Sequence, residues 1–357
     1  MTIDIPTTQT AVVIKKTGKE WSLAVDDAYP VPELQVGQVL VRITYTGVCF
    51  SDVSAINGHW PFQSTCDVPG HEGVGRVVAL HPDLVGKSNA PAIGLRVGVP
   101  LLRNPCFACE RCRAPDGEVF CPHSGFHGSH ANGSFEQYIA LYASYLVPIP
   151  DACEDSVVGP VLCGGVTAYK AIKKSGVRGG QWLAVAGAGG GLGTFAVQYA
   201  VALGIRVVAI DTGNDKAEAL RALGAEVFVD FKAEKDVVAK VKEVTGGGAH
   251  GVVVLAPVEK TYNDALAYVH FQGCVVCVAL PGASTRIHVA PGFMVENDAR
   301  IVGSLVGTRR DVLEALDFAA RGLVVPRVEV AAVGEVSEVF RRLERGEVVG
   351  RVVLDMR

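Results

Sequence analysis

The sequence predicts an α/β protein with two domains, a β-rich domain followed by a domain built on a parallel sheet. The first 150 residues hold short β-branched runs separated by Gly and Pro, a pattern typical of a compact β unit with long loops. From about Cys163 the pattern changes to apolar strands, Gly-rich turns and helical segments in alternation, which indicates βαβ units. A length of 357 residues agrees with two domains, and 49% apolar residues supply a sizeable core.

The expected elements follow in order along the chain. In the first part the clearest strands are expected at 39–45 and 75–80. The second part begins with a strand, a glycine-rich turn, a helix and another strand, at 182–186, 187–193, 195–203 and 206–210. Two helices and a final strand are expected at 311–319, 335–343 and 350–355. We place the final strand back on the first domain.

Charge and composition limit the expected partners. The formal net charge is −4 and no basic stripe is present, so neither nucleic acid nor a membrane surface is an expected partner. The weakly apolar stretch 181–210 is broken by glycines and by Gln198 and Arg206, so a membrane span is not expected. The N-terminus lacks an apolar signal core, and ten cysteines are too few for a disulfide scaffold. We therefore expect a cytoplasmic protein.

Four cysteines lie within sixteen residues, at Cys106, Cys109, Cys112 and Cys121. In an intracellular chain this clustering indicates metal ligands rather than disulfides. Thiolate is a soft ligand that suits zinc, and four thiolates complete a tetrahedral shell with no open position. We expect a zinc ion that holds a loop and performs no chemistry.

The glycine-rich turn between a strand and a helix predicts a nucleotide site. The better frame is G-x-x-G-x-x-G, and the residues expected to offer backbone amides to a pyrophosphate are Gly187, Gly190, Gly191, Leu192 and Gly193. Asp211 ends the next strand, where its carboxylate would accept hydrogen bonds from ribose hydroxyls and repel a 2′-phosphate. This arrangement favours NAD over NADP. Taken alone, a tight turn followed by an ordinary surface Asp would look the same.

A second metal site is expected from residues far apart in the sequence: Cys49, His71 and Cys163. Two thiolates and one imidazole leave one tetrahedral position open for water or substrate, which is the composition of a catalytic zinc. Each residue taken singly could be an ordinary core residue. Their occurrence together with the four-cysteine loop and the nucleotide turn favours the metal.

Several stretches point to one family, and they are 70–75 (GHEGVG), 106–112 (CFACERC), 133–138 (GSFEQY), 186–193 (AGAGGGLG) and 315–323 (ALDFAARGL). By these stretches the chain resembles the zinc-dependent alcohol dehydrogenases of the medium-chain dehydrogenase/reductase family, in their yeast-type branch. The resemblance implies a GroES-like β domain over 1–164 and 305–357 and a Rossmann domain, with a doubly wound parallel sheet, over 165–304. It also implies a catalytic cleft between these domains, NAD and two zinc ions as cofactors, and a homotetramer, alternatively a dimer.

The resemblance assigns roles to individual residues. It implies that Cys49, His71 and Cys163 bind the catalytic zinc, and that Glu72 lies close behind the metal. Asp52 would orient His71, the usual task of a hydrogen-bond partner of a metal ligand. The remaining matches are Ser51, whose hydroxyl would touch the substrate oxygen, Lys216 near the adenosine ribose, and Arg351 near the pyrophosphate.

The chain departs from the family pattern around the substrate. Phe50 replaces a cationic residue, Ser54 replaces the histidine that ends the proton relay, and Leu101 replaces a tryptophan. Trp60 is kept, whereas Leu280 replaces another long side chain. Because leucine is smaller than an indole, we expect a wider substrate site that favours aryl or branched alcohols and aldehydes over ethanol. The segment between Cys112 and Cys121 is one residue longer than is usual in the family, and the extra residue is expected in a turn at 115–117.

Several other readings stay open. The histidines His123, His127 and His130 lie in a Gly/Ser-rich loop and are expected to be solvated. Cys274 and Cys277 are expected to pack in the core of an apolar strand. Two functions other than a zinc alcohol dehydrogenase are considered: a zinc-independent quinone or enoyl reductase of the same superfamily, and a non-enzymatic nucleotide-binding relative.

Overall fold

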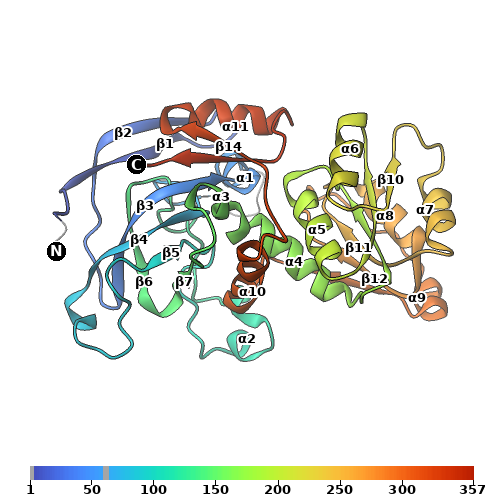
Figure 1. Cartoon of the computed structure of the whole chain (residues 1–357), viewed down its shortest axis with the longest axis horizontal. Helices are drawn as coiled ribbons and strands as arrows, with labels where there is room; N and C mark the ends of the chain where they lie inside the picture. The colour runs from blue at the N-terminus through green and yellow to red at the C-terminus, as the bar shows by residue number, and fades with distance from the viewer. Residues whose placement is uncertain (1–3, 59–63) are drawn as a thin grey trace. The chain divides into compact units, whose positions relative to one another are not determined.

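The computed structural model describes residues 4–58 and 64–357, and the chain divides into two compact units (Figure 1). Unit 1 comprises 1–163, Thr308–Ala320 and Pro326–Arg357, and unit 2 comprises Gly164–Gly307 and Arg321–Val325. The segment Arg321–Val325 groups with unit 2, where the backbone N–H of Val325 donates to Oε1 of Gln198 at 2.8 Å.

Unit 1 is built on a seven-stranded sheet with the order β14-β15-β3-β4-β5-β7, in which β6 also pairs with β3. In this sheet β14 and β15 pair in parallel, and the other neighbours pair antiparallel. The strands are β3 (Gln38–Val48), β4 (Gly73–Leu80), β5 (Arg96–Gly98), β6 (Tyr138–Tyr142), β7 (Val147–Pro148), β14 (Val328–Ala332) and β15 (Arg351–Asp355). A separate two-stranded sheet consists of β1 (Thr8–Lys16) and β2 (Ser22–Pro30).

The strand β3 lies at the centre of unit 1 because β4, β6 and β15 all pair with it. Its burial is nearly continuous, and its β-branched side chains pack in a core that includes Phe135 and Phe340. The helices of unit 1 are α1 (Phe50–Asn57), α2 (Glu110–Arg113), α3 (Asp155–Val158), α10 (Arg309–Ala320) and α11 (Val336–Glu344). Helix α11 buries Val336, Val339 and Phe340, which lie on one helical face.

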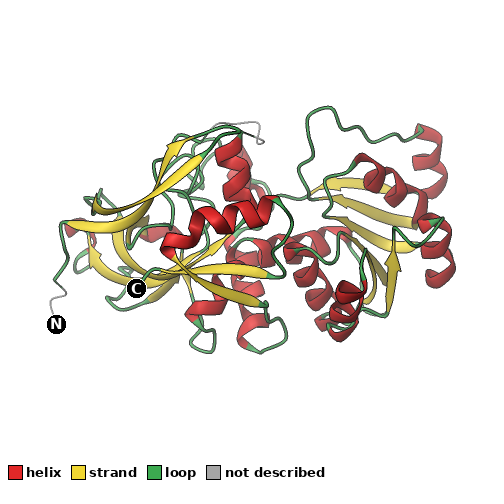
Figure 2. Ribbon diagram, turned by 90° about the horizontal axis from the view of Figure 1, so that it is seen from above, coloured by secondary structure: helices red, strands yellow, loops and turns green. Residues whose placement is uncertain are grey.

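Unit 2 is a parallel six-stranded sheet with the order β10-β9-β8-β11-β12-β13. Its strands are β8 (Trp182–Ala186), β9 (Arg206–Asp211), β10 (Val227–Asp230), β11 (Ala249–Val254), β12 (Val269–Cys277) and β13 (Arg300–Gly303). Its helices are α4 (Gly164–Ser175), α5 (Gly191–Ala202), α6 (Asn214–Ala222), α7 (Val237–Thr245), α8 (Glu259–Tyr268) and α9 (Pro291–Asn297). Helices lie on both sides of this sheet (Figure 2).

The strand order reverses between β8 and β11, so unit 2 is a doubly wound sheet of the Rossmann type. In such a sheet a ligand binds outside the carboxyl ends of the strands at the point of reversal. The glycine-rich turn leaves β8 at that end. The glycine-rich turn therefore lies at the edge of the sheet where folds of this type bind a ligand.

The strands expected at 182–186 and 206–210 are confirmed as β8 and β9. The closing strand is also confirmed on the first sheet, since Val352–Asp355 pairs with Tyr45–Val48 of β3. Within residues 4–58 and 64–357, no helix combines the length and apolar character that a membrane span requires.

Candidate metal centres and nucleotide-binding turn

Four buried side chains of unit 1 come together in what we call the buried metal group: Cys49, His71, Glu72 and Cys163. Cys49 lies between β3 and α1, His71 and Glu72 precede β4, and Cys163 follows the short 3-10 helix η4 (Gly159–Leu162). Thr46 of β3 is the register partner of Gly73 of β4, so the end of one strand lies beside the start of the other. The sheet therefore brings together residues that are far apart in the sequence.

The spacing of the buried metal group fits a tetrahedral ion. One ligand atom from each of the four residues lies within 4.8 Å of the others. The two sulfurs of Cys49 and Cys163 are 4.0 Å apart, and Nε2 of His71 is 3.2 Å from Sγ of Cys163. A zinc ion with Zn–S bonds of about 2.3 Å separates its sulfur ligands by about 3.8 Å, close to the observed value.

Each of the two thiols of the buried metal group shifts the pKa of the other. The hydrogen bond with Cys163 lowers the pKa of Cys49 well below its ordinary value, although burial opposes this effect. The same hydrogen bond and burial raise the pKa of Cys163 well above its ordinary value. A divalent cation would stabilise both groups as thiolates.

Glu72 pairs with Arg351 inside unit 1. Nη2 of Arg351 donates to Oε1 of Glu72, whereas Oε2 is buried without a hydrogen-bond partner among the described residues. Burial raises the pKa of Glu72 to about 7, and the charge of Arg351 opposes the rise. A buried carboxylate oxygen without a donor fits a site that receives a cation. The contact of Arg351 with a pyrophosphate stays a prediction.

Asp52 connects the start of α1 to the buried metal group. Its Oδ2 accepts a hydrogen bond from the backbone N–H of Cys49 at 2.9 Å, and its Oδ1 lies 2.8 Å from Nδ1 of His71. Because the carboxylate can only accept, Nδ1 carries the proton and Nε2 is directed to the metal group. Ser51 lies half-buried in the first turn of the same helix, two residues after Cys49.

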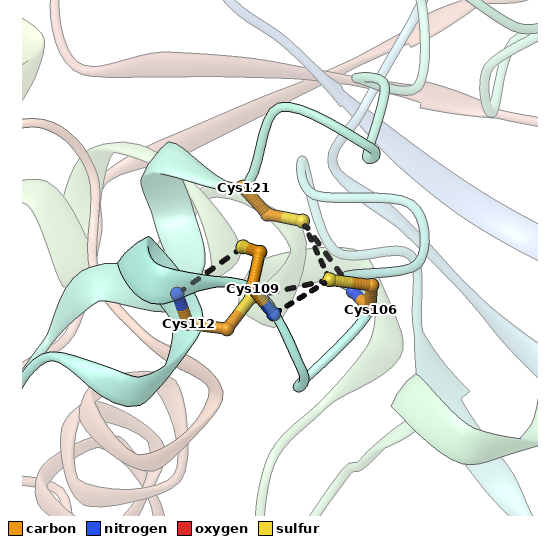
Figure 3. A group of neighbouring side chains, drawn as sticks. All are labelled: Cys106, Cys109, Cys112 and Cys121. Atoms are coloured by element: carbon orange, nitrogen blue, oxygen red, sulfur yellow. Dashed lines mark hydrogen bonds between the residues drawn. The ribbon is translucent and has the colours of Figure 1, made fainter.

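The four cysteines Cys106, Cys109, Cys112 and Cys121 form a second group, which we call the cysteine metal group (Figure 3). Sγ of Cys106 lies 4.0 Å from Sγ of Cys112 and 3.6 Å from Sγ of Cys121. Backbone N–H groups of Ala108 and Cys109 lower the pKa of Cys106 to about 6, so this residue is readily a thiolate. Donor number and spacing match a closed tetrahedral zinc site.

The turn expected at 115–117 is confirmed in the loop that joins Cys112 to Cys121 of the cysteine metal group. Asp116 has a φ of 58°, and the N–H of Gly117 bonds to the carbonyl of Ala114. A Cβ on Gly117 would lie 1.8 Å from the carbonyl oxygen of Arg111, so only glycine fits there. In the 3-10 helix η2 (Gly117–Phe120), Glu118 accepts hydrogen bonds from the hydroxyl of Tyr145 and the N–H of Arg309, which fixes the loop to unit 1.

The glycine-rich turn of unit 2 joins β8 to α5, whose N-cap is Gly190. Gly187 has a φ of 89°, which favours glycine. A Cβ on Gly193 would lie 2.3 Å from the carbonyl oxygens of Gly187 and Ala188. Gly191 and Leu192 form the first turn of α5, as expected for backbone amides that receive a phosphate.

Sequence reasoning missed Gly189, because the G-x-x-G-x-x-G pattern that begins at Gly187 gives this position no role. Its N–H donates to Oδ2 of Asp211 at 2.8 Å, and a Cβ there would lie 2.5 Å from Cδ of Lys216. Oδ1 of Asp211 accepts a hydrogen bond from Nζ of Lys216, also at 2.8 Å. The turn, the carboxylate and the lysine therefore form one cluster. The signal in the sequence was the unbroken run of glycines at 189–191.

Two family profiles match the chain. Residues 35–151 match the profile described as "Alcohol dehydrogenase GroES-like domain", and residues 191–321 match that described as "Zinc-binding dehydrogenase". Alcohol dehydrogenase 1 of Neurospora crassa is 42% identical, with 99% of this chain and 98% of that protein covered. An alcohol dehydrogenase of Schizosaccharomyces pombe is 39% identical, with 99% of each covered.

The chain belongs to the zinc-dependent alcohol dehydrogenases of the medium-chain dehydrogenase/reductase family. Solved structures share its fold. Acetophenone reductase from Geotrichum candidum, in complex with NAD, has a TM-score of 0.84 and 26% identity, with 99% of this chain and 98% of that chain covered. The alcohol dehydrogenase of Aeropyrum pernix has a TM-score of 0.84 and 27% identity, with coverage of 97% and 99%.

This alcohol dehydrogenase is an NAD-linked zinc oxidoreductase with small-molecule alcohol or aldehyde substrates. The predicted family, fold class and enzyme class are confirmed. The zinc-independent reductase and the non-enzymatic relative are not retained.

The residues expected around the substrate are distributed over both units of the dehydrogenase. Phe50, at the start of α1, is 49% exposed, whereas Ser54 and Leu101 are buried in unit 1. Leu280 lies in unit 2 after β12 and is 63% exposed. Trp60 lies outside the described residues.

The expectation of three solvated loop histidines is wrong for one of them. His123 and His130 are exposed, but His127 is buried, with 2% of its surface accessible. Its Nδ1 lies 2.8 Å from the carbonyl oxygen of Pro100, which turns the ring inward. The core position of Cys274 in β12 is confirmed, and Cys277, half-buried at the end of the same strand, packs against the core of unit 2.

Proposed function

We propose that this dehydrogenase prefers bulky or aryl alcohols and aldehydes to ethanol, and that the buried metal group holds its catalytic zinc. The observation that supports this proposal most is the set of four buried donors in unit 1, two thiols, an imidazole and a carboxyl, with one carboxyl oxygen left without a hydrogen-bond donor. Cys49, His71 and Cys163 would bind the ion with Glu72 close behind it, which leaves the fourth tetrahedral position open for water or substrate.

The proposed mechanism assigns each residue a task. Zinc bound in this group supplies Lewis acidity toward the alcohol or carbonyl oxygen. Cys49 and Cys163 balance the charge of the ion, and Asp52 holds His71 in the tautomer that offers Nε2. Ser51 would relay the proton of the substrate hydroxyl to the ribose hydroxyl of the cofactor while the substrate carbon transfers its hydride to NAD. In the opposite direction Ser51 would return the proton to the carbonyl oxygen.

The proton route differs from that of yeast-type relatives. Ser54 stands where those relatives have a histidine, and it is buried in α1. A serine does not titrate near neutral pH, so the proton must leave through the ribose hydroxyl of the cofactor to water or to another group.

The proposed cofactor site lies in unit 2. Gly187, Gly190 and Gly193 would bring backbone amides to the pyrophosphate, and Asp211 with Lys216 would contact the adenosine ribose. Because the carboxylate repels a 2′-phosphate, NAD is preferred to NADP. Arg351 is proposed to contact the pyrophosphate as well.

A substrate panel tests the proposal. We expect kcat/KM with NAD to be at least tenfold higher for benzyl or cinnamyl alcohol than for ethanol, because Leu101 leaves more room than a tryptophan and apolar area adds binding energy. A kcat/KM that favours ethanol would contradict the proposal. Leu101→Trp should restore preference for ethanol.

We further propose a cytoplasmic homotetramer, with a dimer as the alternative, on the basis of the family resemblance. The mass of the purified enzyme by light scattering tests the assembly. Fractionation of the source cells tests the location.

A further inference from the structure

The imidazole of His127 is a buried polar group that the mechanism above does not use. Its Nδ1 is bonded to the carbonyl oxygen of Pro100, but its Nε2 is buried without a hydrogen-bond partner among the described residues. Buried polar atoms without a partner are rare, and each costs stability. A group of this kind requires a reason, and a bound molecule is one.

His127 lies directly opposite Leu101 on a short antiparallel ribbon. The N–H of His127 donates to the carbonyl of Leu101, the N–H of Arg103 donates to that of Gly125, and Leu102 bridges to Phe126. In this register Leu101 and His127 form a cross-strand pair, so their side chains extend from the same face of the ribbon. The imidazole therefore neighbours the leucine that replaces the substrate-facing tryptophan of the family.

The same ribbon runs beside the buried metal group. The N–H of Val99, two residues before Leu101, donates to the carbonyl of Gly73, two residues after His71. On the other side, a Cβ on Gly128 would lie 2.7 Å from the carbonyl oxygen of Gly70, so the backbone next to His127 packs against the residue that precedes His71. Both strands of the ribbon thus contact the segment that presents His71.

The chemistry of His127 makes its Nε2 an acceptor. A carbonyl oxygen can only accept, so the proton lies on Nδ1, and in the neutral ring Nε2 offers a lone pair. Burial lowers the pKa of His127 to about 4; the hydrogen bond to Pro100 opposes this effect, and the charge of Arg103 adds to it. The ring therefore remains neutral at the working pH, and a zinc ion nearby would reinforce this state.

We propose that Nε2 of His127 accepts a hydrogen bond from the substrate, so that this dehydrogenase selects aryl or branched alcohols and aldehydes that carry a second donor, such as a phenolic or additional hydroxyl group. This inference rests on the proposed function, because it names a chemical class within the bulky substrates proposed above. A substrate without the donor leaves the acceptor buried and unpaired, which is a strong basis for discrimination.

Matched substrates test the role of His127. The ortho, meta and para hydroxybenzyl alcohols are compared with the corresponding methylbenzyl alcohols, which have nearly the same shape, by kcat/KM with NAD at pH 7 to 8. We expect at least one ring position at which hydroxyl is preferred to methyl by about tenfold or more. His127→Phe should remove that preference while kcat/KM for the methyl compound changes by only a few-fold.

Each ratio compares kcat/KM for the hydroxyl and methyl compounds on the same variant, so a general loss of stability affects both values and cancels. This includes the loss caused when the carbonyl of Pro100 is left without its hydrogen-bond donor. His127→Leu replaces the Phe variant if the latter does not fold, and His127→Gln, which keeps an acceptor, should recover part of the preference. The control is His123→Phe, because His123 is exposed in the same loop, and it should leave the ratios unchanged.

The outcomes separate the two proposals. If benzyl alcohols are oxidised better than ethanol but no hydroxyl position is preferred, or if the preference survives in His127→Phe, the inference is wrong and the proposed function stands. If ethanol is favoured over every benzyl alcohol, both are overturned.

Discussion

Asp52 shows how one side chain can set both local structure and chemistry. One carboxylate oxygen caps α1 through the N–H of Cys49, and the other holds Nδ1 of His71. Both partners are expected ligands of the same ion, so their positions depend on a residue that would not touch the metal. Hydrogen-bond partners of this kind typically change metal affinity or activity by about 10- to 100-fold when they are removed.

Asp52→Asn should therefore lower kcat/KM by about 10- to 100-fold and weaken zinc binding, since an amide can donate to His71 and favour the wrong tautomer. Steady-state kinetics and zinc retention during dialysis against a mild chelator measure both effects. Asp151→Asn is the control because Asp151 is fully exposed. Equal activity and equal zinc retention in the two variants would argue against the orienting role.

Asp211 is a second single residue with a proposed role, the choice between NAD and NADP. Asp211→Ser should raise the ratio of kcat/KM with NADP to that with NAD by at least about tenfold, because the repelling charge is lost and Lys216 is released to pair with a 2′-phosphate. Kinetics with both cofactors measure the ratio. Asp215→Ser, at an exposed aspartate in the first turn of α6, is the control. An unchanged ratio would show that Asp211 does not face the ribose.

At the scale of elements, the loop of the cysteine metal group depends on a turn that admits only glycine. The spacing of its four cysteines predicted that they lie together, and the sequence also predicted the turn at 115–117. The contacts that fix the loop, from Glu118 to Tyr145 and Arg309, could not be predicted because Arg309 lies far along the chain. Only the folded unit brings it near the cysteines.

Gly117→Ala should destabilise this loop, since its Cβ would overlap the carbonyl of Arg111. We expect a loss of about 1–3 kcal/mol in the free energy of unfolding and a weaker second zinc, with the active-site zinc retained. Denaturant unfolding and zinc counts check this. Gly334→Ala is the matched control because a Cβ at Gly334 meets nothing within 4 Å. If Gly117→Ala behaves like that control, the turn is not strained.

At the scale of the whole molecule, local patterns predicted the alternation of strands and helices in unit 2 and the return of the last strand to the first domain, where the structure pairs it with β3. They also predicted that Cys49, His71 and Cys163 come together and that the four cysteines do, because thiols and imidazoles leave a clear chemical signature, whereas Glu72 was expected only from the family resemblance. They did not predict the buried position of His127, since its Gly- and Ser-rich surroundings look like a solvated loop. Nor did they predict that Arg351 reaches Glu72, because that contact depends on long-range packing.

Stability should also depend on pH through Glu136, which is buried and accepts a hydrogen bond from Gln9. Burial raises its pKa well above the ordinary value of 4.5, with Gln9 opposing the rise. The neutral carboxyl therefore contributes stability that is fully present below pH 4.5, the ordinary pKa of the unfolded chain, and is lost as the pH rises toward the pKa in the folded protein. The loss is at most about 1.4 kcal/mol per pH unit.

Glu136→Gln removes this titration while keeping an acceptor for Gln9. The free energy of unfolding of both proteins is measured by denaturant from pH 5 to 7. As the pH rises, the value for the variant should increase relative to the value for the parent. Glu33→Gln, at an exposed glutamate, is the control. A difference that stays constant or shrinks with pH would mean that Glu136 is ionised in the folded protein.

The zinc content per chain of the parent enzyme and of Cys163→Ser, measured by elemental analysis on the samples used for activity, tests the central claim most directly. We predict two zinc ions per chain in the parent, and one in the folded Cys163→Ser variant together with loss of NAD-dependent alcohol oxidation. A parent that oxidises alcohols at full rate with one zinc or none, or a Cys163→Ser variant that keeps both zinc and activity, would contradict the account.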